Sequence, residues 1–579
     1  MLICGLFALS AQAEDVFPKD DWQDAPNSIA SPDAVVGGEI AIMAHQYPKS
    51  FNYYLDPNAF SSQLFGSLYD TLFSIHPVTL EVEPALARKL IISDDRKTFT
   101  VQLDPSATWS DGTPITAQDV RWTYDTIMDP NNLTGPHKID LERFDPPKVV
   151  SDIEIRFTAK TVHWNNLLAI VGFRVLPQHA FAGQDFNKIN FEFPVVSGAY
   201  RLGEIKEGLF AKIERRDDYW NKDAKRGQNT GNFRTLKFMF FQDQDNAFEA
   251  FKKGNIDLYP VYSAQQWVVR AMGDAYDKNW IVKQKVFNHE PVGFQGFAMN
   301  LRRPPFNDVR VRKALAHLLD RPRLNKTLMY DQYFLHRSYW EDLYDSKHPC
   351  ENELIAYDKD KARALLKEAG WVANPETRLL ERDGKPLTIT FLTRDASSDK
   401  FLVIYQEDLR DVGIEMKIEQ KDWAAWLKDM DAFNFDMTWA AWGGGLWKDP
   451  ESLWSSNEAD RPAGQNVTGF KHDKVDALIE EQKTIFDVQQ RNDILRRIDK
   501  IIAAEVPYVL LWNLNYTRLL YWNKFGTPPT VLSKYDDESA AYGYWWYDED
   551  AVADLEDARK NDHALPRKPS SVTFDETFR

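Results

Sequence analysis

Apolar and polar residues follow two different periods along the chain. Residues 98–103, T-F-T-V-Q-L, alternate with the period of two that is typical of a strand, and residues 35–43 read as a strand containing Gly37 and Gly38. Residues 61–73 place Leu64, Leu68 and Leu72 four positions apart, which predicts a helix with one apolar face. Segments of the two kinds succeed each other almost throughout, so the pattern predicts an α/β fold.

Capping residues predict where several helices begin and end. Thr116, with Asp119 three positions later, has the spacing of a capping box, and Asp308 stands before the helical run V-R-V-R-K-A-L-A-H-L-L. Two further helices, 242–253 and 358–369, are each followed at once by glycine. These signals place Asp119 in a structural role, so we interpret it as a cap and not as half of a catalytic carboxylate pair.

The length and composition indicate a large globular protein of more than one unit. The chain has 579 residues, which exceeds the roughly 250–300 residues at which single cores stop growing. The sequence contains no low-complexity linker, which favours lobes that share crossing segments. The net charge of -17 argues against nucleic acid as a partner and favours cationic ligands at long range.

The N-terminus resembles the end of an export signal. Residues 1–13 are mostly apolar and end in Ala11-Gln12-Ala13 before acidic residues, although the basic start of a signal peptide is absent. A weakly packed N-terminus is the alternative. After cleavage only Cys350 would remain, so we expect no intramolecular disulfide.

The common catalytic motifs are absent from the sequence. None of the eleven histidines has the spacing of a helix-borne zinc site, and the sequence has no G-x-S-x-G nucleophile motif. The lone Cys350 stands beside acidic residues, which raise a thiol pKa and disfavour a nucleophile. Paired carboxylates are too numerous to exclude, so a glycoside hydrolase remains an alternative.

Residues 437–450, M-T-W-A-A-W-G-G-G-L-W-K-D-P, combine bulky aromatics with three consecutive glycines. Such a stretch is compatible with a phosphate loop, a structural turn or the wall of a binding pocket. A phosphate loop requires Gly-Lys followed by Ser or Thr, and Leu446 and Trp447 stand in that position. We therefore disfavour a nucleotide ligand.

Four sequence blocks point to a known family. They are V-E-P-A-L-A from residue 82, W-S-D-G-T-P-I-T-A-Q-D-V from 109, N-L-R-R-P-P-F-N-D-V-R-V-R-K-A-L-A-H-L-L-D-R from 300, and V-P-Y-V-L-L-W from 506. In these blocks the chain resembles the extracellular solute-binding proteins of peptide ABC importers, the dipeptide- and oligopeptide-binding family 5, and among them the Yej-type oligopeptide and microcin binders. The resemblance covers nearly all of the mature chain.

The resemblance implies a two-lobed α/β fold of the type II periplasmic-binding-protein class, which closes on its ligand and docks on a membrane permease. The expected divisions are a signal at 1–13, lobe one at 14–69, an extra subdomain of lobe one at 70–194, lobe one again at 195–297, lobe two at 298–512, and a return to lobe one at 513–579. We expect the hinges at 298–301 and 510–513.

The resemblance also implies where a peptide would bind. Family members bind peptides near two tryptophans about nineteen residues apart, and Trp423 and Trp442 have that separation. Gly443, Gly444 and Gly445 match the edge that offers backbone groups to an extended peptide. Related proteins have W-x-x-D, whose aspartate holds the free ammonium of the peptide, but no acid follows Trp442 here before residue 449.

The opposite wall of the ligand site is expected in the first loop, A-H-Q-Y-P-K-S-F-N-Y-Y. His45, Tyr47, Phe51 and Tyr53 are the candidates for ligand contact there. Packing in a loop or core is the alternative for each of them. It is also the alternative for Trp423 and Trp442, because large aromatics in strand-like segments usually fill interiors.

From these observations we expect a periplasmic, non-enzymatic and monomeric protein that binds oligopeptides, works with an inner-membrane ABC permease, and needs no metal or organic cofactor. The absent aspartate leaves three possibilities: a ligand whose N-terminus is blocked or modified, a terminus held through water, or another acid in its place. A secreted carbohydrate-active enzyme is the first alternative. The same fold binding an oligosaccharide, an opine-like compound or another non-peptide ligand is the second.

Overall fold

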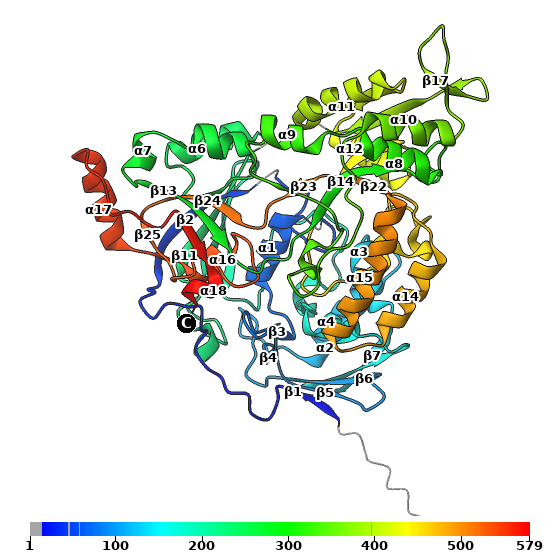
Figure 1. Cartoon of the computed structure of the whole chain (residues 1–579). Helices are drawn as coiled ribbons and strands as arrows, with labels where there is room; N and C mark the ends of the chain where they lie inside the picture. The colour runs from blue at the N-terminus through cyan, green and yellow to red at the C-terminus, as the bar shows by residue number, and fades with distance from the viewer. Residues whose placement is uncertain (1–13, 45–46, 57, 242, 395, 579) are drawn as a thin grey trace, which may run out of the picture. The chain divides into compact units, whose positions relative to one another are not determined.

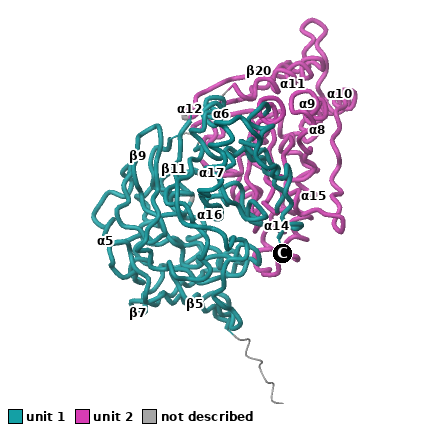
Figure 2. Tube along the Cα trace, turned by 90° about the vertical axis from the view of Figure 1, so that its left-hand side faces the viewer, with its two compact units in different colours: residues 1–261, 272–288, 517–579 teal, residues 262–271, 289–516 magenta. Residues whose placement is uncertain are grey.

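The structure is a computed structural model that describes residues 14–44, 47–56, 58–241, 243–394 and 396–578. The chain forms two compact units, shown in different colours in Figure 2. Unit 1 comprises residues 1–261, 272–288 and 517–579, and unit 2 comprises residues 262–271 and 289–516. None of the described helices combines the length and apolarity needed to cross a membrane.

Unit 1 is built on a mixed eight-stranded sheet. Its central strand pairs in parallel with a neighbour on each side, while most of the outer pairs are antiparallel. In sheet order the strands are β27 (Ser571–Thr573), β13 (Ile281–Phe287), β24 (Thr517–Trp522), β12 (Leu258–Pro260), β2 (Gly37–Ala44), β11 (Phe233–Phe240), β10 (Phe210–Arg215) and β9 (Tyr200–Lys206). Strand β24 comes from the C-terminal part of the chain, which therefore returns to the middle of this sheet.

A second sheet of unit 1 is antiparallel and lies mostly within the predicted subdomain. Its strands in order are β1 (Asp15–Phe17), β5 (Ala87–Ile92), β6 (Thr98–Leu103), β8 (Glu154–Ala159) and β7 (Phe144–Ser151), visible at the bottom of Figure 1. Strand β6 has the predicted bounds. Strand β1 was not predicted, and it joins this sheet by pairing Asp15 with Ile92.

One helix of unit 1, α2, begins where its capping residues predict. Thr116 and Asp119 form the expected capping box at the start of α2, where the Asp119 carboxylate accepts a hydrogen bond from the Thr116 N–H at 2.9 Å. The helices are α1 (Ala59–Leu68), α2 (Ala117–Met128), α3 (Gly135–Leu141), α4 (Asn165–Val171), α5 (Gln178–Phe181), α6 (Gln244–Lys252), α7 (Asp274–Asp277), α16 (Ala540–Tyr544), α17 (Glu549–Lys560) and α18 (Phe574–Thr577). Helix α1 ends at Leu68, so the predicted Leu72 lies beyond it, where it is fully buried.

Unit 2 is built on a five-stranded sheet with helices packed around it. The strands in order are β20 (Glu415–Gln420), β19 (Thr388–Thr393), β21 (Met437–Trp442), β14 (Phe294–Met299) and β22 (Tyr508–Leu510). Its helices are α8 (Val309–His317), α9 (Arg321–Leu328), α10 (Lys359–Glu368), α11 (Asp399–Asp411), α12 (Trp423–Asp431), α13 (Glu451–Trp454), α14 (Asp473–Lys483) and α15 (Val488–Glu505). Asp308 and Asp358 cap α8 and α10 as predicted.

The chain passes between the units at other residues than those predicted. The boundaries fall at 288/289 and 516/517, and residues 262–271 also belong to unit 2. The predicted crossing at 298–301 lies instead in and just after β14, which β21 and β22 flank within one sheet. Because Ala298 is fully buried in that sheet, it is poorly placed to act as a hinge.

Candidate functional site

Trp423 presents an exposed aromatic face on unit 2. It is the first residue of α12, which Asp422 caps by accepting a hydrogen bond from the Ala425 N–H at 3.0 Å. The side chain is 46% exposed, which is rare for a tryptophan that only fills a core. This position is compatible with the predicted ligand contact and does not fit the packing alternative.

Trp423 belongs to a cluster of three planar groups. Its ring stacks on Trp426, with centroids 5.2 Å apart and an interplanar angle of 22°. The Arg394 guanidinium lies 5.2 Å from the Trp423 ring centroid and 5.5 Å from that of Trp426. Such stacking and cation–π contacts hold the exposed ring in one orientation without covering it.

Trp442 ends β21 and is held by one polar contact. Its Nε1–H donates to the Tyr508 hydroxyl at 3.1 Å, and Tyr508 is buried on the neighbouring part of the same sheet. Burial raises the pKa of Tyr508 above its ordinary value, so this hydroxyl stays neutral. Trp442 is half-buried, so part of its ring faces solvent beside the glycines that follow it.

The three glycines differ in what requires them. A Cβ on Gly444 would lie 2.1 Å from the Pro291 carbonyl oxygen, so only glycine allows this close approach of two backbone segments. A Cβ on Gly443 would meet nothing within 4 Å, and one on Gly445 would meet only the Trp447 carbonyl oxygen at 3.6 Å. Close packing therefore requires glycine at position 444, whereas among the described residues a Cβ at position 443 or 445 would cause no clash.

The glycine loop leaves its backbone donors open. Residues 443–445 are exposed, and among the described residues their N–H groups donate no hydrogen bond. An extended ligand pairs with such groups when it adds as a strand at a sheet edge. The loop thus has the backbone chemistry that the pocket-wall interpretation requires.

Gly445 or Leu446 stands where related proteins have the ammonium-binding acid, and a lysine ion pair lies next to this position. The Lys448 Nζ donates to Asp342 Oδ2 at 2.8 Å and to the Gly445 carbonyl oxygen at 3.1 Å. Its side chain is only 8% exposed, so the pair is largely removed from water. Lys448 holds the loop at Gly445 and neutralises Asp342, which its ion pair brings next to the loop.

One of the aromatic residues predicted in the first loop is packed inside unit 1. Phe51 is fully buried among Phe60, Phe191 and Tyr47, so the packing alternative replaces ligand contact for this residue. His45 lies outside the described residues.

The two tyrosines of this loop are only partly covered. Tyr47 packs edge-on against Phe240, with ring centroids 4.8 Å apart. Burial and the charge of Glu207 raise the pKa of the Tyr47 hydroxyl. The ring of Tyr53 packs against that of His137, with centroids 4.7 Å apart. Both retain some exposed surface and remain candidate contacts.

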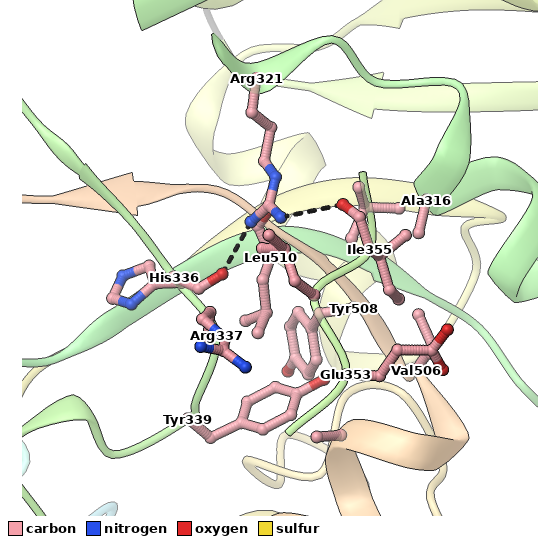
Figure 3. A pocket seen from close by; sticks show the side chains of 13 residues that line it. Ala316, Arg321, His336, Arg337, Tyr339, Glu353, Ile355, Val506, Tyr508 and Leu510 are labelled. Carbon is pink, nitrogen blue, oxygen red and sulfur yellow. Dashed lines mark hydrogen bonds between the residues drawn. The ribbon is translucent and has the colours of Figure 1, made fainter. Parts of the chain in front are cut away.

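A small pocket of unit 2 next to β22 is structural. It has a volume of about 30 Å³, close to that of one water molecule, and is lined by residues that include Arg321, Tyr339 and Tyr508. Figure 3 shows the Arg321 guanidinium turned toward the carbonyl oxygens of His336 and Ile355, to which it donates at 2.8 and 3.3 Å. Burial lowers the pKa of Arg321 to about 10, which leaves it charged at neutral pH.

Sequence reasoning did not identify the residues that hold Trp423, the glycine loop and Lys448 in place. Pro291 and Arg394 are distant in sequence from Gly444 and Trp423, beside which they lie. Lys448 stands within the tryptophan- and glycine-rich stretch, but its partner is 106 residues away. No local spacing could have signalled these contacts, because they depend on how the strands are ordered in the sheet.

Comparisons with known proteins agree with the fold. Residues 81–463 match the model of the bacterial extracellular solute-binding proteins, family 5 Middle. The chain is 28% identical to YejA of Escherichia coli (strain K12), over 92% of each chain. It is 27% identical to the probable peptide-binding protein YejA of Agrobacterium fabrum, over 80% of this chain and 82% of the relative.

Among solved structures, the oligopeptide-binding protein AppA of Bacillus subtilis, in complex with a nonapeptide, superposes with a TM-score of 0.74. The match covers 89% of this chain and all of AppA, at 21% identity. The family model alone spans more than half of the chain, and the predicted α/β fold is confirmed. The chain therefore belongs to family 5 of the bacterial extracellular solute-binding proteins.

Proposed function

We propose that this protein is the periplasmic substrate-binding component of an ABC importer, which captures oligopeptides and delivers them to an inner-membrane permease. Family membership supports a binding role, and the relatives named for peptide binding support a peptide ligand. The observation that carries the proposal is the glycine loop, whose exposed N–H groups stand beside the half-buried ring of Trp442.

This arrangement suits recognition of many peptide sequences. Backbone donors at Gly443–Gly445 would pair with the main chain of any extended peptide, whatever its side chains. The broad faces of Trp423 and Trp442 would contact side chains without demanding one shape. In this proposal Tyr47 and Tyr53 supply contacts from unit 1, and Phe51 does not.

The Lys448–Asp342 pair bears on how the N-terminus of the peptide is held. An aspartate that holds a peptide ammonium must present an uncompensated carboxylate, whereas Asp342 is already paired at 2.8 Å. We therefore propose that recognition at this loop does not require a free α-amino group. Peptides with a blocked or modified N-terminus are suitable ligands.

Native mass spectrometry of protein purified from the periplasm tests the ligand class. The proposal predicts a copurified peptide, bound in a one-to-one complex and released intact. Copurified sugar alone would favour the non-peptide alternatives. Turnover of an oligosaccharide that is lost on removing one carboxylate would favour the carbohydrate-active enzyme.

Binding of synthetic peptides tests the site. Calorimetric titration should give similar affinities for penta-alanine and its N-acetylated form, because Asp342, the acid next to the glycine loop, is already paired with Lys448. A loss of affinity of about 30-fold or more on acetylation would instead indicate a buried ion pair to the terminus.

A further inference from the structure

Unit 1 contains a cavity that the proposed peptide site does not use. Its volume is about 570 Å³, within the range of about 300–1,000 Å³ that is usual for small-molecule sites. Asp70, Arg174 and Tyr219 line it, together with Tyr69, Ile75 and Tyr544. None of these residues belongs to unit 2, which holds Trp423, Trp442 and the glycine loop.

The Asp70 carboxylate offers one open oxygen to this cavity. Its Oδ2 accepts from the Tyr219 hydroxyl at 3.0 Å and from the Trp220 Nε1–H at 3.1 Å. Its Oδ1 accepts no hydrogen bond from the described residues. Burial raises the pKa of Asp70 to about 6, although the Trp220 and Tyr219 hydrogen bonds oppose that rise. Both donors are neutral, so within the described part of the chain no cation in contact balances the carboxylate.

The Arg174 guanidinium lines the same cavity and forms no ion pair with the described residues. Its Nη1–H donates to the Tyr69 carbonyl oxygen at 2.9 Å, and its charge stabilises ionised Asp70. Within the described chain, however, no carboxylate lies within ion-pairing distance of Arg174. The cavity therefore holds two opposite charges that influence each other without forming a pair.

Most other charged groups around the cavity are engaged by their own neighbours. Arg226 pairs with Asp24 at 3.1 Å, and the Lys222 Nζ donates to the Asp217 carbonyl oxygen. Glu83 accepts from the Trp22 indole, and Asp536 accepts from the Ser533 hydroxyl. Asp70 and Arg174 are thus well placed to contact a ligand directly.

From this geometry we infer that the unit 1 cavity binds a small zwitterion of the free α-amino acid class, with its ammonium on Asp70 Oδ1 and its carboxylate on Arg174. A simple cation would leave the guanidinium without an oppositely charged partner, and a simple anion would leave the carboxylate without one. A zwitterion forms a charge-assisted hydrogen bond with each. The apolar surfaces of Ile75 and Tyr544 would contact its side chain.

Calorimetric titration of the full mature chain with glycine, L-leucine and L-glutamate tests this inference. At least one of the three should bind at millimolar concentration or below. N-acetyl-L-leucine removes the ammonium and L-leucinamide removes the carboxylate, so each should bind at least about ten-fold more weakly than L-leucine. These ligand comparisons use the unaltered protein and do not depend on whether a variant folds.

Two variants locate the site. Asp70→Asn keeps an oxygen that accepts from Tyr219 and Trp220 but removes the charge, and Arg174→Gln removes the guanidinium. Each should weaken amino acid binding by at least about ten-fold, while Arg234→Gln, an exposed arginine of the same unit outside the cavity, should not change it.

Three results would overturn the inference. They are no binding of any of the three amino acids, equal binding of the two blocked analogues, and amino acid binding that both variants leave unchanged. Peptide affinity measured on the same Asp70→Asn and Arg174→Gln proteins distinguishes this inference from the proposed function, because peptide binding should persist in both.

Discussion

Trp423 and Phe51 are both large aromatics that the sequence placed in the ligand site, and the structure treats them in opposite ways. Trp423 is 46% exposed at the start of a helix in unit 2, whereas Phe51 is 0% exposed in the core of unit 1. Around Phe51, other rings pack edge-on, and around Trp423 a stacked tryptophan and an arginine leave one face open. Residue type and approximate location along the chain therefore do not separate a ligand contact from a core residue.

The first prediction, with the largest effect, concerns the buried ring. Phe51→Ala should lower the free energy of unfolding by about 3–5 kcal/mol, because it leaves a cavity among closely packed rings. Urea unfolding of the purified variant measures this change. A loss below about 1 kcal/mol would mean that the ring is less enclosed than its contacts indicate.

The second prediction compares two neighbouring glycines. Gly444→Ala should cost about 2 kcal/mol and displace the loop, since the new Cβ would lie 2.1 Å from the Pro291 oxygen. Gly443→Ala is the matched control, and it should change stability by less than about 0.5 kcal/mol because nothing lies within 4 Å. Equal losses from the two substitutions in thermal unfolding would contradict this account of the loop.

The third prediction concerns pH and extends the comparison to the polar interior of unit 1. Burial raises the pKa of Asp70 from 3.8 to about 6, so the folded state holds this proton more tightly than the unfolded state does. The contribution of Asp70 to stability is therefore greatest below pH 4, decreases as the pH rises from about 4 to about 6, and stays constant above that. The decrease should amount to about 3 kcal/mol.

Asp70→Asn is the control for that pH dependence. The variant cannot ionise at this position, so the difference in unfolding free energy between it and the unaltered protein should vary across pH 4–6. A constant difference over this range would mean that the carboxylate is better solvated than its position in the cavity indicates.

The fourth and smallest effect on stability is expected at the exposed ring. Trp423→Ala should change the free energy of unfolding by less than about 1 kcal/mol, because nearly half of the side chain already contacts water. Urea unfolding compares it directly with Phe51→Ala. A loss as large as that of Phe51→Ala would place Trp423 in the core and remove it from the proposed site.

Local signals predicted much of the fold. The alternation of residues 98–103 gave strand β6 with its observed bounds, and Thr116, Asp119 and Asp308 gave helix starts that the structure confirms. These features depend on residues only a few positions apart, for which spacing and side-chain chemistry are sufficient.

The unpredicted features depend on contacts between distant residues. Strand β1 joins a sheet through Ile92, residues 262–271 belong to unit 2, and Asp342 neutralises Lys448 from 106 residues away. No periodicity in the sequence encodes such pairings. The sequence predicted that Trp423, Trp442 and the three glycines contact the ligand. It could not predict how exposed each of them is or that the N–H groups of the loop are open, because these properties also depend on distant contacts.

The central claim is that the exposed face of Trp423, the ring of Trp442 and the open loop after it bind peptide. Calorimetric titration of Trp423→Ala and Trp442→Ala with the copurified peptide, resynthesised, tests it most directly, with Trp122→Ala of helix α2 as the control. The account predicts peptide affinity at least about ten-fold lower for the first two variants and unchanged for the third. Unchanged peptide affinity in both Trp423→Ala and Trp442→Ala would contradict it.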